Sequence, residues 1–139
     1  MILAFVLLAG GAEAGLVGWL TATTRSWEFV QATGGIKINE PVLVEGRLLL
    51  PVEYDATGTT AVTRAPTLAN SGLTVRRIKV RRAAQGVLTL EVVTQVIEKN
   101  QVAGRFHYAE IAGLPSGAYE VYYGSAEDPE RRLGSVRLR

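Results

Sequence analysis

The sequence contains no cysteine and only one histidine among its 139 residues. Without cysteine there is no disulfide, no thiol nucleophile and no cysteine-based metal site. The single histidine, His107, has no second one to form a metal site or a catalytic pair with, so we expect a surface or rim residue. No serine lies in a nucleophile-elbow pattern, and there is no glycine-rich phosphate loop. We therefore predict a non-enzymatic protein with no catalytic residues, metal, cofactor or small-molecule substrate.

Charge is scarce at the start of the chain. The first 24 residues hold no lysine or arginine and one carboxylate, Glu13. About twenty apolar residues suffice to cross a bilayer as a helix. A lone carboxylate in lipid costs on the order of 2.5–3.5 kcal/mol, so Glu13 is expected to be protonated, paired or close to water. Small residues recur here at four-residue intervals, a spacing that lets helices pack closely; they include Gly11, Gly15, Gly18 and Ala14.

Large apolar residues continue this pattern toward a glycine pair at Gly34–Gly35. Leu16, Trp19 and Leu20 are followed by Trp27 and Val30 at helical spacing. The spacing predicts a helix over residues 1–33, serving as a filament core or a membrane anchor. Its expected packing residues are Gly11, Glu13, Ala14, Gly15, Leu16, Gly18, Trp19 and Leu20. Residues 26–29 also alternate as a strand does, so the part beyond Thr24 has two interpretations.

A secretory signal peptide is the alternative for residues 1–14. Ala12-Glu13-Ala14 has the small-x-small form of a cleavage site after an apolar run. No basic residue precedes that run, and the apolar character continues to Leu20. Both interpretations stay open at the level of sequence.

From Ile36 onward the sequence favours short strands separated by turns. We expect strands over residues 36–45, 47–54, 60–63, 74–82, 87–97, 102–111, 119–123 and 133–138. A three-residue loop at 84–86 joins two of them, with Lys79 opposite Glu91 and Val80 opposite Leu90. The five cations between Arg76 and Arg82 are expected to form a solvated strand face, because no aromatic residues are interleaved for base stacking. With a net charge of only +2, we expect no nucleic-acid partner.

Leu114, Gly117 and Tyr119 have the spacing of a tyrosine corner, in which a buried tyrosine hydroxyl bonds to backbone just upstream. This pattern and the strand count predict an immunoglobulin-like antiparallel β-sandwich over residues 36–139. The expected fold class is therefore mainly β, with one long N-terminal α-helix.

This architecture resembles that of archaeal type IV pilins and archaellum-type filament proteins. The resemblance rests on residues 17–24 (VGWLTATT), on 36–39 (IKIN) and on 48–52 (LLLPV). It implies a structural subunit of an extracellular filament for adhesion or motility. Such a subunit is inserted in the membrane before assembly and becomes a helical homo-oligomer at the cell surface. The alternative function is a secreted or membrane-anchored β-sandwich binding module of the cell envelope.

Overall fold

The computed structural model of the chain describes residues 22–98 and 103–139. These ranges are mainly β, with 49% of their residues in strands. In chain order the elements are β1 (Thr23–Thr24), α2 (Trp27–Ala32), β2 (Lys37–Ile38), β3 (Val42–Val44), β4 (Arg47–Glu53), β5 (Leu73–Ala84), β6 (Val87–Val96), β7 (Phe106–Ile111), β8 (Gly117–Tyr123), the 3-10 helix η3 (Pro129–Arg131) and β9 (Arg132–Leu138).

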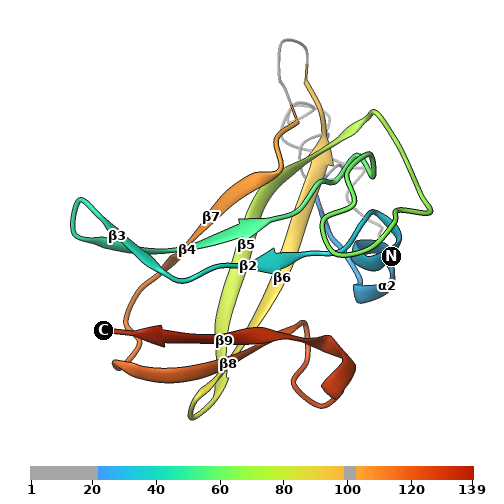
Figure 1. Cartoon of the computed structure of the whole chain (residues 1–139). Helices are drawn as coiled ribbons and strands as arrows, with labels where there is room; N and C mark the ends of the chain where they lie inside the picture. The colour runs from blue at the N-terminus through green and yellow to red at the C-terminus, as the bar shows by residue number, and fades with distance from the viewer. Residues whose placement is uncertain (1–21, 99–102) are drawn as a thin grey trace, which may run out of the picture.

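The strands form two sheets (Figure 1). In the five-stranded sheet, β6 pairs with β5 along one edge and with β1 and β8 along the other, and β9 continues from β8. In the four-stranded sheet, β4 pairs with β7 along one edge and with β2 and β3 along the other. The hairpin of β3 and β4 extends from the rest of the molecule as an arm, and its two-residue turn has positive φ at Glu45 and Gly46.

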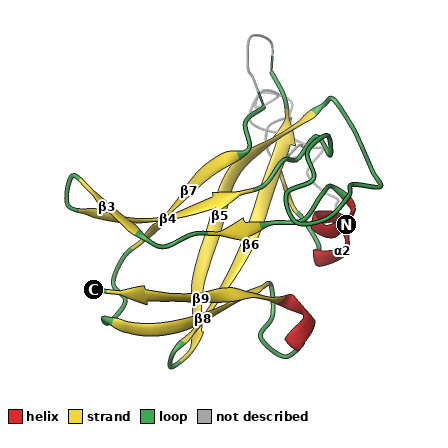
Figure 2. Ribbon diagram, viewed as in Figure 1, coloured by secondary structure: helices red, strands yellow, loops and turns green. Residues whose placement is uncertain are grey.

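The expected helix over residues 1–33 is wrong. Thr23 and Thr24 are extended and pair with Thr94 and Val93 of β6, so no continuous helix reaches residue 33. The only helical part of the expected range that is described is α2, six residues long, with its own N-cap at Ser26 (Figure 2). It ends before Gly34 and Gly35, as the sequence predicts. Residues 1–21 lie outside the described part of the chain.

No helix within residues 22–98 and 103–139 has the length and apolar character needed to span a membrane.

The strand pairing also contradicts the prediction of an antiparallel immunoglobulin-like sandwich. Strands β6 and β8 run parallel, with Leu88 opposite Val121 and Leu90 opposite Tyr123. The strand expected at 60–63 is absent from the described residues, where this segment belongs to a long connection between β4 and β5. Individual backbone hydrogen bonds hold this connection in place; for example, the amide of Thr63 donates to the carbonyl oxygen of Gly34 at 2.9 Å.

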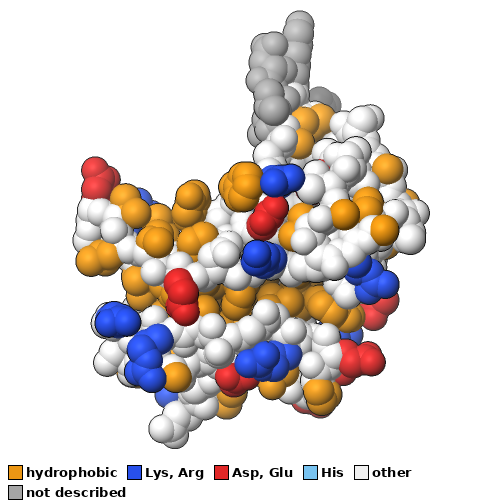
Figure 3. All heavy atoms as spheres, in the orientation of Figure 1, with side chains coloured by type: hydrophobic (Ala, Val, Ile, Leu, Met, Phe, Trp, Pro, Cys, Tyr) orange, Lys and Arg blue, Asp and Glu red, His pale blue; other side chains and the backbone are white. Residues whose placement is uncertain are grey.

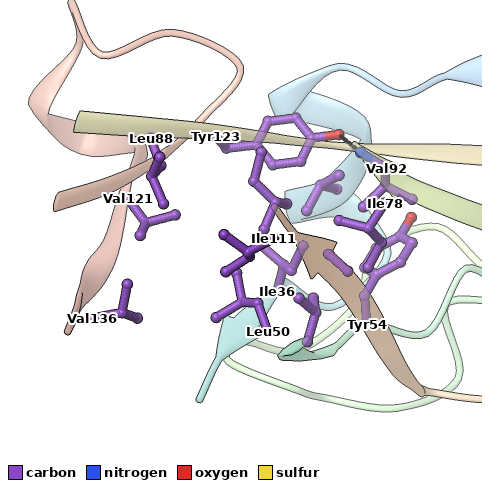
Figure 4. Close-up of a cluster of buried hydrophobic side chains, with 14 of the residues drawn as sticks. Ile36, Leu50, Tyr54, Ile78, Leu88, Val92, Ile111, Val121, Tyr123 and Val136 are labelled. Carbon is purple, nitrogen blue, oxygen red and sulfur yellow. Dashed lines mark hydrogen bonds between the residues drawn. The ribbon is translucent and has the colours of Figure 1, made fainter. Parts of the chain in front are cut away.

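The core lies between the two sheets and is built from alternating residues of their strands. Leu88, Leu90 and Val92 of β6 and Leu50 and Val52 of β4 belong to one cluster and are almost completely buried. Figure 4 shows Leu88, Val92 and Leu50 in this cluster. Helix α2 closes one end, because Val30 is fully buried in the same cluster. The residues just after β1 therefore belong to the folded unit.

Two local predictions agree with the structure. The β5–β6 hairpin sets Lys79 opposite Glu91 and Val80 opposite Leu90. At the tyrosine corner, the hydroxyl of Tyr119 donates a hydrogen bond to the carbonyl oxygen of Pro115 at 2.7 Å.

Candidate interaction surface

The most connected carboxylate among the described residues, Asp55, is used inside the fold. It accepts hydrogen bonds from the backbone amide of Thr57 at 2.9 Å and from the hydroxyls of Thr57 and Thr59 at 2.6 and 3.0 Å. Burial by itself would raise the pKa of Asp55, but these hydrogen bonds outweigh it and lower the pKa below the ordinary value. Asp55 therefore fixes the start of the long β4–β5 connection as a charged, fully bonded group.

His107 is also a structural residue. Its side chain is half-buried at the edge of the core, and its Nε2 lies 3.0 Å from the carbonyl oxygen of Tyr54. Burial lowers the pKa of His107, which favours the neutral ring. A carbonyl needs a donor, so Nε2 carries the proton and the ring holds β7 to the end of β4.

The outer surface of the four-stranded sheet has a different character, because it exposes several apolar side chains beside charged ones. The register places Lys37, Arg47, Glu53 and Glu110 on this same side. Phe106 and Tyr108 of β7 are 65% and 61% exposed, and Val42 and Val44 of β3 are 40% and 46% exposed. Alternation along β4 turns Leu50 and Val52 into the core and their neighbours outward. We call this surface the apolar face; its residues are Val42, Val44, Leu49, Pro51, Phe106 and Tyr108.

The register makes these side chains neighbours on one surface. Val42 lies opposite Leu49, and Pro51 lies opposite Tyr108, so β4 bridges the two outer strands. Figure 3 shows hydrophobic side chains along the β3–β4 arm and over the strands that continue from it. Because the patch crosses three strands, it is a continuous surface rather than a set of scattered apolar residues.

Ion pairs lie at two sides of the apolar face. At one side the guanidinium of Arg47 contacts Glu110 at 2.8 Å, and this hydrogen bond lowers the pKa of Glu110. At the other side Arg105 contacts Glu53 at 3.2 Å and lies 5.0 Å from the centre of the Phe106 ring. Each of these arginines is thus paired within the chain. The exposed Lys37 lies opposite Glu53 on the same side, so the rim of the apolar face has three cations and two carboxylates.

Several hollows lie elsewhere on the described surface, including one beside the β3–β4 arm and one beside α2. One, of about 580 Å³, separates the β3–β4 arm from the end of β9 and is lined by Glu40, Pro41, Leu43, Leu48, Arg137 and Arg139. The other, of about 690 Å³, lies beside α2 and is lined by Trp27, Glu28, Gln31, Ala32, Arg64, Thr67 and Glu130. Both are open and have charges of both signs, and neither contains a cluster of groups arranged for proton transfer or nucleophilic attack.

The basic strand expected around Arg76–Arg82 is β5. Its outward-facing Lys79 and Arg81 lie 3.8 and 3.9 Å from Glu91 of the adjacent strand. Arg76, Arg77 and Arg82 are exposed. This arrangement agrees with a solvated sheet face, because the carboxylate lies between the cations and separates their charges.

The residues that the sequence singled out fall into two groups. Gly11, Glu13, Ala14, Gly15, Leu16, Gly18, Trp19 and Leu20 lie outside the described residues. Leu114, Gly117 and Tyr119 lie at the tyrosine corner, where Leu114 packs against the core. Leu114, Gly117 and Tyr119 are not part of the apolar face.

Sequence reasoning missed the apolar face, although two signals were present. Val42, Leu43 and Val44 form an unbroken apolar strand without the polar alternation of a solvated edge. Phe106 and Tyr108 alternate with His107 and Ala109, which places both aromatic rings on one side of β7. That this side faces outward could be learned only from the packing of the two sheets.

Searches for a matching protein family, for similar curated proteins and for similar solved structures find no match for this chain.

Proposed function

We propose that this protein is a non-enzymatic binding module of the cell envelope that docks a protein partner through the apolar face. The observation that supports this most directly is the pair of exposed aromatic side chains, Phe106 and Tyr108, on a strand whose other side faces the core. Aromatic residues are enriched in the central parts of protein interfaces, because they exclude much water at a small cost in side-chain entropy.

The polar groups support a binding role over a catalytic one. Asp55 and His107 have shifted pKa values, which is common in active sites. Here each group is held by bonds to its own fold, and neither lies in the apolar face. The chain uses these groups for stability, and its exposed apolar surface for contact.

The envelope location rests on the amino-terminal sequence. Residues 2–9 are apolar, and Ala12-Glu13-Ala14 follows as a small-x-small site. The filament hypothesis places its helical core over residues 1–33, of which the part beyond Thr24 has two interpretations. Since β1 and α2 replace the second part of that helix, we place the binding-module hypothesis first.

Cysteine labelling tests whether the apolar face is covered in the cell. The chain has no native cysteine, so Val42→Cys adds one thiol to the face with little change in size. Ser135→Cys is the matched control, because Ser135 is exposed on β9 of the other sheet. Each protein is labelled with a maleimide in its native envelope fraction, and the rate is divided by that of the same protein unfolded in urea.

We expect the normalised rate at position 42 to be at least about tenfold below that at position 135. Val42 is 40% exposed in the single chain, so the fold itself does not cover this position and we attribute such protection to a bound partner. Similar normalised rates at the two positions would overturn the proposed function.

A further inference from the structure

We propose that the apolar face binds a second copy of this chain, and that the two copies form a two-fold symmetric dimer with their four-stranded sheets stacked. This inference rests on the proposed function and identifies the partner. It follows from the size of the apolar face, from its charge balance and from its shape.

The size of the face matches one half of a stable interface. Phe and Tyr side chains present roughly 200 Å² each, so the exposed parts of Phe106 and Tyr108 amount to about 250 Å². With the four aliphatic side chains the face approaches roughly 400 Å² of apolar surface. A standard interface covers about 800 Å² per partner, and somewhat more than half of it is non-polar. The apolar content of the face is therefore what one side of such an interface requires.

The charges favour an identical partner over a strongly charged one. Arg47 is paired with Glu110, and Arg105 with Glu53, and Lys37 opposite Glu53 adds one cation. The rim therefore presents both signs with an excess of a single positive charge. A two-fold contact brings each surface against a copy of itself, which repeats every charge on both sides. Such repetition is disfavoured where a surface has a large excess of one sign, whereas a polyanionic or polycationic partner needs such an excess.

The face is also suited to stacking by its shape. Its residues come from three adjacent strands of one sheet, and the extended β3–β4 arm widens that sheet beyond the core (Figure 1). Two sheets pack face to face about 10 Å apart through interdigitating side chains. Aromatic residues on β7 and smaller valines on β3 provide the large and small side chains that such packing combines.

Cross-linking of the full chain in its native envelope fraction tests the dimer. Adjacent strands lie about 5 Å apart, so equivalent positions on two stacked faces fall within roughly 20 Å of each other. A bis-maleimide with a flexible spacer of that length is added to the Val42→Cys protein and, in parallel, to the Ser135→Cys protein. The product is identified by mass spectrometry of the cross-linked peptides.

The expected result is a homodimer linked through position 42, with at most a tenth as much dimer through position 135. Adducts of position 42 with other proteins, without homodimer, would overturn the dimer and leave the proposed function standing. Equal yields of homodimer at the two positions would also overturn it. If position 42 gives no adduct and is labelled as fast as position 135, both the dimer and the proposed function fail.

A second measurement removes the dependence on a reagent. The Phe106→Ser/Tyr108→Ser protein loses the two exposed rings, and Tyr122→Ser on the outer side of the other sheet is the matched control. Sedimentation of the full chains in mild detergent gives the dimer dissociation constant. We expect the double variant to raise this constant at least about thirtyfold and the control to change it less than about threefold. A double variant that dimerises as tightly as the control would refute the proposal, and circular dichroism checks that each variant is folded.

Discussion

Removing a single buried hydroxyl, that of Tyr123, tests how the start of the folded unit is attached. The hydroxyl accepts a hydrogen bond from the amide of Val92 at 3.0 Å and donates one to the carbonyl of Arg25 at 2.7 Å (Figure 4 shows the former). It thereby joins β8, β6 and the residue that follows β1. The ring is almost fully buried, and burial raises the pKa of Tyr123, so the neutral hydroxyl is the form that the fold holds.

The Tyr123→Phe change keeps the ring and leaves two backbone groups without this partner. The amide of Val92 lies in a fully buried residue, and an unsatisfied buried donor costs about 1–3 kcal/mol. Arg25 is half-exposed, so water replaces the hydroxyl at its carbonyl at a smaller cost. We therefore expect the free energy of unfolding to fall by about 2 kcal/mol and Tm by roughly 8 °C.

Urea unfolding followed by tryptophan fluorescence measures this change, since the ring of Trp27 lies 5.7 Å from that of Tyr123. Tyr122→Phe is the matched control; its side chain points to the outer side of the sheet, and we expect a change below about 0.5 kcal/mol. Hydrogen exchange at the amide of Arg25, which donates to Val92 O at 2.8 Å, should become faster in the Tyr123 variant only. If Tyr123→Phe unfolds at the same urea concentration as Tyr122→Phe, the hydroxyl does not stabilise the fold as argued.

Three further substitutions test the long connection and the arm. A side chain at Gly58, where φ is +71°, would lie 1.9 Å from the carbonyl oxygen of Leu68, so Gly58→Ala should lower the free energy of unfolding by more than 2 kcal/mol. Gly46 has φ +77° with open space around it, so Gly46→Ala should lower the free energy of unfolding by only about 1 kcal/mol. If thermal melts show the same loss of stability for Gly58→Ala and Gly46→Ala, the predicted clash at Gly58 is contradicted. Because the pKa of Asp55 is lowered in the fold, its carboxylate stabilises the protein above about pH 4 and loses this effect as the pH falls through the lowered pKa. Asp55→Asn should therefore be less stable than the unsubstituted protein by about 1–2 kcal/mol at pH 7. In thermal melts below about pH 4, this difference in stability should become smaller. A stability difference that does not change with pH would argue against a charged Asp55.

Elements whose partners are close in the sequence were predictable. The β5–β6 register follows from a short loop with Gly86 at positive φ and from the alternation of the two strands on either side. The tyrosine-corner bond spans four residues, and the end of α2 follows from two adjacent glycines. In each case the geometry is set by dihedral preferences and side chains within one short segment, so the sequence contains what is needed.

Elements whose partners are distant were not predictable in the same way. Residues 22–33 have an apolar period that suits a helix, yet Thr23 and Thr24 are extended, because β6 offers them unpaired backbone groups about seventy residues away. The parallel pairing of β6 with β8 likewise depends on how two hairpins dock, which no local pattern specifies.

The amino-acid sequence by itself determined that this chain is mainly β, where its hairpins turn, and which residues alternate along each strand. The tertiary structure decided which residues with helical spacing form a strand instead, and which side of each strand is buried. Val52 and Tyr108 are both typical strand residues, but one is buried in the core and the other is exposed on the apolar face. Alternation separates the two sides of a sheet, and only the packing of a second layer decides which of them meets water.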